Sequence, residues 1–401
     1  MNRSVLDNHG RHEIEGLGEG SLPPVRREGP ARVLFLSAQT HGLKSNGIEM
    51  MHATEGRSDV DWVHVRMTPT PWMKKVMATV RFSDGKWDLS QTRRRFAWSR
   101  LLRGWLREQL PLERFDAIHV ITRVHCAGVA AELERADPDR RVVLAVSVDT
   151  TAVGDRREFA PDVRQSRLDE LAERKMYRRM DMVQCRSRWA QRSVVDDYGM
   201  EEVRTVVAPP SPGAPVRVRE PFGGDTERPI RIGMCGNPWS RKGGPRLWRW
   251  FRERWRGRAE LRVVCRDAGF LAGEEGVVWE SQMPREELFE RFYPELDVLV
   301  LPAHRDQTPW VLAEAASCGV CCVGPDQCGV PDMVRHGETG LLCHRDDEAC
   351  FVESVEKLLG DRDLIDRMGA AAAEHAAANL RREQNYPRVI DKLVELVDER
   401  A

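Results

Sequence analysis

The segment Leu296-Asp-Val-Leu-Val-Leu-Pro302, followed by Asp306-Gln-Thr-Pro-Trp-Val-Leu-Ala-Glu314-Ala-Ala-Ser-Cys-Gly319, decides the class of fold. Its first part is almost wholly apolar, which is typical of a strand that is buried on both faces of a sheet. Thr308 is a good N-cap and Pro309 suits the first helical position, so we expect a helix that ends at Gly319. A buried strand that leads into a helix predicts an α/β sheet.

Two carboxylates flank the start of this helix. Asp306 falls in the preceding loop, and Glu314 falls about one and a half turns into the helix. The N–H groups at a helix N-terminus and the helix dipole both favour a phosphate. Carboxylates beside a phosphate can accept hydrogen bonds from the hydroxyls of a sugar and of a ribose. The pattern therefore indicates an enzyme that uses a nucleotide sugar.

Strands alternate with helices through the rest of the chain. In the first half we expect strands at 32–37, 62–65, 117–121, 142–146 and 182–184, and helices at 127–134 and 168–179. In the second half we expect strands at 230–235, 261–265, 277–279, 296–301, 320–323 and 340–342, and helices at 244–256, 285–292, 309–317, 348–359 and 363–379. We therefore predict two Rossmann-like, doubly wound α/β domains that face each other across a cleft.

A cluster of prolines, Pro209, Pro210, Pro212 and Pro215, separates the two series of elements. Proline interrupts regular structure, so we place a linker at this cluster. The parts that we predict are a flexible N-terminal tail (1–30), an acceptor-side domain (31–215), a linker (216–228), a donor domain (229–384) and a C-terminal helix (385–401).

The composition excludes several classes of protein. The chain has 401 residues, with 62 Lys and Arg against 63 Asp and Glu, so its net charge of −1 gives no general attraction for nucleic acid. No apolar run approaches the ~20 residues of a membrane-spanning helix. The N-terminal tail lacks the apolar core of a signal peptide. We therefore expect a cytoplasmic protein.

Ten cysteines occur in the chain, and six of them lie between Cys318 and Cys350. Without an export signal we expect reduced thiols. Zinc ligation is one interpretation of this group, but the paired C-x2-C spacing of a zinc site is absent. The other interpretation, small buried side chains on a short strand, agrees better with the apolar surroundings of Cys321 and Cys322. We therefore predict no metal site.

A second motif, Ile232-Gly-Met-Cys-Gly-Asn237-Pro-Trp-Ser-Arg241-Lys242-Gly243-Gly244, runs from a strand through a cationic glycine loop into a helix. Glycines let the backbone approach a phosphate, and either cation can neutralise it. A solvated surface loop would have the same composition, so the motif alone leaves both interpretations open. The spacing of a P-loop, G-x4-G-K-[ST], is absent.

Taken together, the two motifs resemble those of the retaining glycosyltransferases of the GT-B fold, family 4. The segments that match follow the family's order: Gly236-Asn237 through Arg241-Lys242-Gly243-Gly244, Met283-Pro-Arg-Glu-Glu-Leu288, Leu296–Pro302, Asp306-x7-Glu314, Gly329-Val-Pro-Asp-Met-Val334 and His336-Gly-Glu-Thr-Gly-Leu341. The resemblance is strong over 230–343 and looser over 32–215. It also implies that the C-terminal helix crosses back to the first domain.

The resemblance implies a role for each matching residue of the donor domain. Glu314 would hold the ribose of the nucleotide and Asp306 would contact the donor sugar. Lys242 and the backbone N–H groups from Thr308 through Trp310 to Val311 would stabilise the departing diphosphate, which gains negative charge as the glycosidic bond breaks. The other donor-binding candidates are Gly236, Asn237, Arg241 and Gly243.

Some positions depart from the family's pattern. Asp306 replaces a glutamate and is one methylene shorter, and Asn237 stands where an arginine often binds the diphosphate. Asp332 stands where a glutamate is common, and Pro209-Pro-Ser replaces Pro-Asn-Gly. The identity of the donor is therefore open.

The first domain supplies three further candidates. His125 follows the strand expected at 117–121, and the family often has a histidine near the reacting centre there; a lone histidine is, however, more often packed in a core. Asp149 ends another expected strand and either faces the cleft or, as we slightly favour, caps the next helix. Gly47 lies in a polar loop expected at 38–47, which resembles the family's acceptor-side glycine loop.

The region 93–107 is basic and aromatic, with Trp98, Leu101, Leu102, Trp105 and Leu106 on one helical face. Such a helix can lie on an anionic membrane, where family members with lipid-linked acceptors dock. The alternative, which we favour, is a surface helix whose apolar face packs on its own domain. A peripheral contact with the inner face of the membrane therefore stays open.

The resemblance implies a hexosyl- or glycosyltransferase of glycan or polysaccharide biosynthesis. It would move a sugar from a UDP-sugar, GDP-sugar or similar donor to a glycan, lipid-linked or small-molecule acceptor, with retention of configuration and without a metal or other cofactor. Two alternatives stay open: a non-catalytic GT-B-like protein that binds a sugar nucleotide, and a GT-B nucleotide-sugar epimerase.

Overall fold

The computed structural model describes residues 4–6, 12–15, 29–38, 41–67, 69–77, 81–82, 87–88, 90–109, 115–159, 164–165, 167–213, 217–224 and 227–400. Most of the predicted N-terminal tail and part of the predicted linker lie outside these residues. The chain divides into two compact units, one made of Met1–Ala208 with Tyr386–Ala401, the other of Pro209–Asn385.

The first unit is built on an eight-stranded sheet in the order β1-β2-β4-β3-β7-β8-β10-β11. All neighbouring strands run parallel except the pair β1 and β2. The strands are β1 (Ser4–Leu6), β2 (His12–Glu15), β3 (Ala31–Ala38), β4 (Val60–Met67), β7 (Ala117–Val120), β8 (Val143–Val148), β10 (Met182–Cys185) and β11 (Thr205–Val207). Three short strands form a separate small sheet: β5 (Arg81–Phe82), β6 (Trp87–Asp88) and β9 (Arg164–Gln165).

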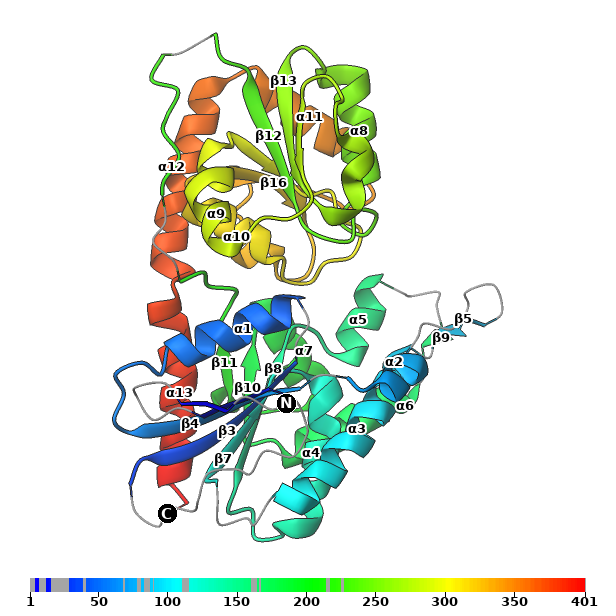
Figure 1. Ribbon diagram of the computed structural model, residues 1–401, viewed down its shortest axis with the longest axis vertical. Helices are drawn as coiled ribbons and strands as arrows, with labels where there is room; N and C mark the ends of the chain where they lie inside the picture. The colour runs from blue at the N-terminus through cyan, green and yellow to red at the C-terminus, as the bar shows by residue number, and fades with distance from the viewer. Residues whose placement is uncertain are drawn as a thin grey trace. The chain divides into compact units, whose positions relative to one another are not determined.

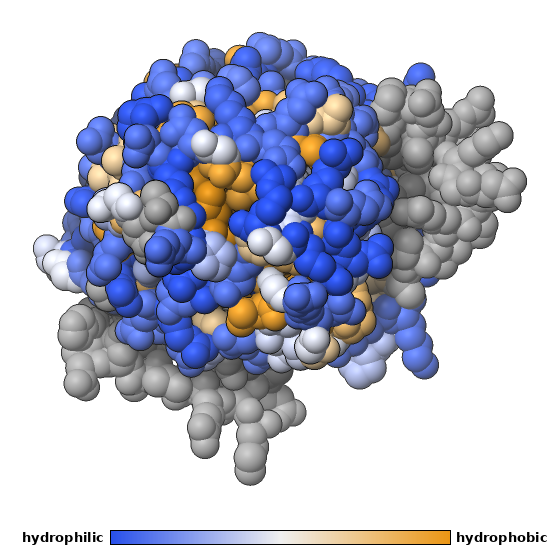
Figure 2. Space-filling view, turned by 90° about the horizontal axis from the view of Figure 1, so that it is seen from above, coloured by the Kyte–Doolittle hydropathy of each residue, from blue (hydrophilic) through white to orange (hydrophobic). Residues whose placement is uncertain are grey.

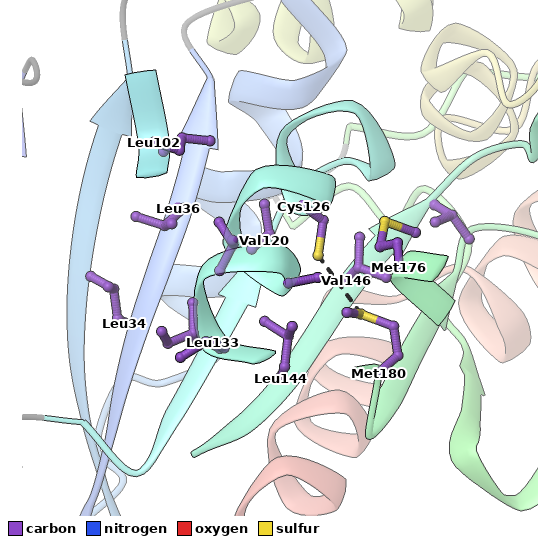
Figure 3. Close-up of a cluster of buried hydrophobic side chains, with 14 of the residues drawn as sticks. Leu34, Leu36, Leu102, Val120, Cys126, Leu133, Leu144, Val146, Met176 and Met180 are labelled. Atoms are coloured by element: carbon purple, nitrogen blue, oxygen red, sulfur yellow. Dashed lines mark hydrogen bonds between the residues drawn. The ribbon is translucent and has the colours of Figure 1, made fainter. Parts of the chain in front are cut away.

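Helices cover both faces of the large sheet (Figure 1). They are α1 (His41–His52), α2 (Pro71–Met77), α3 (Ser90–Gln109), α4 (Arg123–Ala136), α5 (Ala152–Phe159), α6 (Arg167–Arg179), α7 (Arg188–Tyr198) and the C-terminal α13 (Arg382–Asp398), with a 3-10 turn at Glu202–Arg204. Alternate strand residues such as Leu34, Leu36 and Leu144 form one core with α4, as Figure 3 shows. The residues between them face the opposite side, where α1 packs on β3.

The second unit has a parallel six-stranded sheet in the order β14-β13-β12-β15-β16-β17. The strands are β12 (Ile230–Cys235), β13 (Ala259–Val264), β14 (Val277–Glu280), β15 (Val298–Val300), β16 (Cys321–Pro325) and β17 (Gly340–Cys343). Apolar side chains pack on both faces of this sheet in two separate cores. Continuous burial of β15 and β16 explains why their sequences are apolar runs without alternation.

The helices of the second unit lie on both sides of its sheet, with α8 and α11 on one side and α9 and α10 on the other (Figure 1). They are α8 (Gly244–Trp250), α9 (Arg285–Glu287), α10 (Trp310–Ser317), α11 (Glu348–Leu359) and α12 (Arg362–Asn379). Single π-helical turns, Phe251–Trp255 and Leu288–Phe292, continue α8 and α9. Further 3-10 turns occur at Arg266–Leu271, Tyr293–Glu295 and Val330–Asp332.

The doubly wound α/β class predicted from the sequence is confirmed, but some local predictions are wrong. The polar loop expected at 38–47 is largely helix, because α1 already begins at His41. The helices expected at 244–256 and 285–292 change from α-helix to π-helix part-way. The expectation of reduced thiols fails at Cys343 and Cys350, which form a disulfide, whereas the other eight cysteines are free and buried.

Candidate functional site

The loop between β12 and α8 is held against the carboxyl end of β15 by glycine. Gly243 has a φ of 82°, and a Cβ atom there would lie 2.0 Å from the carbonyl oxygen of Pro302. Gly236 has a φ of 128°, and a Cβ atom there would lie 3.0 Å from Cε of Lys242. Both glycines therefore let the cationic loop approach the segment that carries Asp306.

Lys242 meets Asp306 at the centre of this arrangement. The Nζ atom of Lys242 donates a hydrogen bond of 2.5 Å to Oδ2 of Asp306, and both residues are 8% exposed. Nη1 of Arg241 lies 3.4 Å from the same carboxylate oxygen. Two cations and one carboxylate leave a net charge of +1, which suits an anionic ligand. The Asp306 carboxylate therefore points toward Lys242 and is paired with it.

Asn237 and Arg241 shape the loop around this pair. Oδ1 of Asn237 accepts a 2.8 Å hydrogen bond from the backbone N–H of Arg266 and a 3.4 Å contact from the Cys265 thiol. Nη2 of Arg241 donates to the Asn237 carbonyl at 3.0 Å, and its Nη1 lies 3.3 Å from the Arg305 carbonyl. The Asn237 side chain therefore fixes the loop to the end of β13.

The helix that follows Asp306 begins one residue later than the sequence indicated. Pro309 occupies the N-cap position and Trp310 is the first helical residue of α10, so the prediction of Thr308 as N-cap is wrong. The N-cap residue Pro309 makes no side-chain cap hydrogen bond. The backbone N–H groups of the first turn, at Trp310 and Val311, lie at the N-terminus of the helix, which is a favourable position for an anion.

Glu314 lies in α10 and is held by residues that the sequence did not reveal as partners. Its Oε2 atom accepts a 2.6 Å hydrogen bond from the hydroxyl of the buried Tyr293. Burial and the Glu314 charge raise the pKa of Tyr293 well above its usual value, so the phenol remains a donor. Nε of Arg285 lies 3.8 Å from Oε1 of Glu314, and the guanidinium group lies over the Trp310 ring at 5.8 Å.

Gln327 is a further residue that sequence reasoning missed. Its Nε2 atom lies 3.4 Å from the Ala303 carbonyl and 3.3 Å from that of Asp306, so it braces the loop that carries the carboxylate. No motif singled it out, because its partners are backbone atoms that any residue provides. Asp306 is therefore braced by the loop that follows β16, whereas Glu314 is held by Tyr293 of a 3-10 turn and lies near Arg285 of α9.

The candidates of the first unit have different surroundings. His125 lies in the first turn of α4, is 4% exposed and packs on Trp98 with ring centroids 4.3 Å apart. Burial lowers the pKa of His125 to about 3, so the ring is neutral. A ring in this position has the packing role that a lone histidine more often has. The structure does not single it out as a reacting group.

Asp149 and Gly47 also differ from expectation. Asp149 lies one residue beyond β8 but does not cap α5; Thr151 does, because its Oγ1 accepts from the backbone N–H of Gly154 at 2.9 Å. Gly47 lies within α1, and a Cβ atom there would lie 3.4 Å from Phe35 and Ser37 of β3. Its observed role is close packing of a helix on a strand.

The apolar face predicted for 93–107 packs inside its own unit. Trp98, Leu102 and Leu106 are buried in the first core, whereas Phe96 remains 61% exposed. The face drawn in Figure 2, which is seen from above, is mostly hydrophilic, with apolar areas between the polar residues.

Among the described residues, no helix is both long and apolar enough to span a bilayer. The same part of the chain contains no group of three metal-ligating side chains.

Comparison with known proteins agrees with this geometry. The model of the family "Glycosyl transferases group 1" matches residues 259–375, which include β13 to β17, Asp306 and Glu314. This segment of the chain, within the second unit, is therefore similar to the group 1 glycosyltransferases. The resemblance to family 4 that the donor motifs suggested is thereby confirmed.

Two curated relatives match this chain over part of their length. An N-acetyl-alpha-D-glucosaminyl L-malate synthase of Bacillus anthracis is 34% identical over 88 residues, which are 22% of this chain and 23% of the relative. A D-inositol 3-phosphate glycosyltransferase of Nocardia farcinica is 34% identical over 110 residues, 27% of this chain and 24% of the relative. The aligned part thus spans about a quarter of these relatives.

Solved structures show the fold over nearly the whole chain. The HepE protein of Anabaena, crystallised in complex with UDP and glucose, superposes with a TM-score of 0.66 at 14% identity, over 91% of this chain and 100% of that one. The GT-B fold predicted from the sequence is therefore confirmed.

Proposed function

We propose that this protein transfers a sugar from a nucleotide-diphosphate sugar to an acceptor, with retention of anomeric configuration. The observation that carries the proposal is the convergence of Lys242, the N-terminus of α10 and two buried carboxylates at the carboxyl edge of one parallel sheet. Ligands of open α/β sheets bind at this edge. The match of residues 259–375 to the group 1 glycosyltransferases supports the same reaction class.

Each part of the arrangement has a task in the proposed reaction. The first-turn N–H groups of α10 bind the diphosphate, and Lys242 neutralises the charge that develops on it as the glycosidic bond breaks. Arg241 lies beside Lys242 and adds a second positive charge. No metal is required for this charge balance, because the lysine, the arginine and the helix end all favour an anion.

Glu314 is the group that we assign to the ribose. Its Oε2 atom is fixed by Tyr293 and its Oε1 atom faces Arg285 at 3.8 Å, so the carboxylate has one orientation. A carboxylate held in one orientation accepts hydrogen bonds from a diol at little further entropic cost. The ring of Trp310, which lies beside Arg285, adds an apolar surface next to it.

Asp306 has a role in this proposal that the sequence alone did not suggest. Because it is one methylene shorter than glutamate and bonds Lys242, it positions the lysine before the donor arrives. We infer that the diphosphate competes with Asp306 for the ammonium group, and that the carboxylate is then released toward the sugar. Asp306 would thus position Lys242 first and contact the sugar only after the diphosphate has bound.

The donor that we propose first is a UDP-sugar, because the HepE complex contains UDP and has the same fold. A thermal-shift panel of UDP-, GDP-, ADP- and dTDP-sugars tests this choice, since a ligand that binds only the folded state raises its stability. We expect one base to give a clearly larger shift than the other three. If none of the four ligands raised the melting temperature, the result would contradict a nucleotide-sugar site.

The acceptor side and the location of the protein remain proposals. The apolar face of α3 is occupied by its own core, so a membrane contact would use the exposed Phe96 and Trp72 with the neighbouring arginines. We propose a cytoplasmic protein that touches anionic bilayers weakly. Sedimentation with anionic and neutral vesicles tests this contact, and equal binding to both would contradict it.

Asp306 and Asn237 differ from the residues that are common in the family. These differences favour a second candidate function, in which the protein binds the nucleotide sugar without transferring the sugar. Slow hydrolysis of the donor, or transfer in an acceptor screen, separates this candidate from a transferase. Release of free epimerised sugar without any acceptor would instead indicate an epimerase.

A further inference from the structure

A row of buried polar side chains crosses three neighbouring strands of the first sheet. Nε2 of His119 on β7 lies 2.9 Å from Oγ of Ser147 on β8, and this hydroxyl donates a 2.5 Å hydrogen bond to Oε1 of Gln184 on β10. Because the hydroxyl has only one proton, the network assigns the His119 proton to Nε2. The Nε2 amide group of Gln184 is buried and has no hydrogen-bond acceptor among the described residues.

Arg186 continues this row at the carboxyl end of β10. Its backbone N–H donates to the Val148 carbonyl at 2.9 Å, which extends the pairing of β10 with β8 by one residue. Strand alternation places Arg186 on the same face as Gln184. The side chain is 4% exposed, and neither its Nε nor its Nη2 atom has a hydrogen-bond acceptor in the described part of the chain.

Other buried arginines of this unit are paired with carboxylates. Arg123 meets Glu173, and Arg179 bonds Asp137 at 2.9 Å and Asp181 at 3.1 Å. Arg186 has no such partner: Asp149, at the paired position beyond β8, forms no ion pair with it within the described residues. Burying a cation without a counter-ion lowers the stability of the folded state by several kcal/mol. An arginine that stays unpaired at this cost, in a unit that pairs its other buried arginines, indicates a binding role.

The surroundings of Arg186 show where its charge acts. Burial, and to a smaller extent the Arg186 charge, lowers the pKa of His119 to about 3. The neutral ring therefore brings no competing cation into the row. Two nitrogen atoms of Arg186, Nε and Nη2, and the amide nitrogen of Gln184 therefore have no acceptor among the described residues, and they lie toward the edge of the sheet where ligands of open α/β folds bind. Planar, bidentate recognition by arginine suits a phosphate or a carboxylate.

We propose that Arg186, with Gln184 beside it, binds an anionic group of the acceptor, a phosphate or a carboxylate, and so makes anionic hydroxyl compounds the acceptor class. This inference rests on the proposed function, because it assigns a substrate class to the transferase. Asp149, half-buried and next to Arg186 in the register, is then close to the acceptor's hydroxyl groups. The negative charge of Asp149 repels an anion, so the anionic group of the acceptor would lie at Arg186 and its hydroxyl groups near Asp149.

The test measures anion binding to full-length protein saturated with UDP, so that the donor site cannot take up the probe. The probes are glycerol 3-phosphate, L-malate and neutral glycerol. Their binding is measured by thermal shift and by calorimetry. The variants are Arg186→Met and, as a matched control, Arg192→Met, which removes an exposed arginine of α7. We expect one of the two anions, but not glycerol, to bind saturably to the wild type and to the control.

In Arg186→Met this binding should weaken about tenfold or more, because charge-assisted bidentate bonds are lost. Without any probe, the variant should melt at the same temperature as the wild type or higher, because an unpaired buried charge has gone. A lower melting temperature would show a structural arginine and overturn the proposal. Equal anion binding to wild type and Arg186→Met would overturn it as well.

The two proposals fail in different ways. A wild type that binds UDP but neither anion overturns the Arg186 site and leaves the transferase standing. A wild type whose anion binding depends on Arg186 but that binds no nucleotide contradicts the transferase and leaves the anion site standing.

Discussion

The ammonium group of Lys242 and the carboxylate of Asp306 are joined by a 2.5 Å hydrogen bond although 64 residues separate them in the chain. Both groups are nearly buried, so the pair is weakly screened by solvent. The lysine that we propose to bind the diphosphate is therefore already positioned, and paired with a carboxylate, in the protein without a donor.

Asp306→Asn is the substitution that separates positioning from sugar contact. Removing the carboxylate charge frees Lys242, so we expect UDP to bind about threefold to tenfold more tightly, the effect of a partly buried ion pair of about 1 kcal/mol. Transfer from the UDP-sugar should fall. Calorimetric titration with UDP measures the first effect. Unchanged UDP affinity with weaker UDP-sugar binding would mean that Asp306 contacts the sugar and does not restrain the lysine.

Tyr293→Phe removes only the hydroxyl that bonds Glu314. We expect UDP to bind more weakly by about 1 kcal/mol, because a buried carboxylate loses the hydrogen bond that orients it. Pyrophosphate, which lacks a ribose, should bind as it does to the wild type. Competition titrations with the two ligands check this difference. A parallel loss for both ligands would place Glu314 at the phosphates.

Acid should destabilise the first unit through three histidines that are buried among its described residues. Burial lowers the pKa values of His64, His119 and His125 to about 3, whereas an unfolded histidine titrates near its ordinary value of 6.5. Between these values the unfolded chain binds more protons, so the free energy of unfolding falls as the pH falls from 6.5 toward 3. Each proton contributes about 1.4 kcal/mol per pH unit.

His125→Phe keeps a ring against Trp98 and removes one of these protons. Urea unfolding between pH 7 and pH 5 should therefore lose about one third of its pH dependence, if the three histidines contribute equally. His344→Ala, at an exposed position, is the control for the loss of one histidine side chain. Loss of transfer in His125→Phe with an unchanged slope would instead support the catalytic role that the resemblance implied.

Local patterns explain why so much of the fold was predictable. The apolar runs of β12, β15 and β16 and the glycine-ended helix α10 are properties of neighbouring residues. The helix at His41–His52 was missed because its sequence contains glycines and polar residues; it is stabilised by packing, with Gly47 close against β3. Propensity does not reveal a helix of this kind.

The members of the candidate site were predictable from the sequence, but their pairings were not. Lys242, Asp306 and Glu314 belong to motifs, whereas Tyr293 lies in a 3-10 turn and Gln327 in the loop after β16, and neither carries a signal of its own. Arg186 is one arginine among many in the sequence. Its unusual property, burial without a carboxylate, exists only in three dimensions.

Calorimetric titration of the wild type and of Lys242→Ala with UDP, GDP, ADP and dTDP tests the central claim most directly. Lys357→Ala, on α11, controls for the loss of one positive charge. We predict saturable one-site binding of at least one nucleotide to the wild type and the control, lost in Lys242→Ala. A wild type that binds none of the four, or a Lys242→Ala variant that binds as tightly as the wild type, would contradict the account.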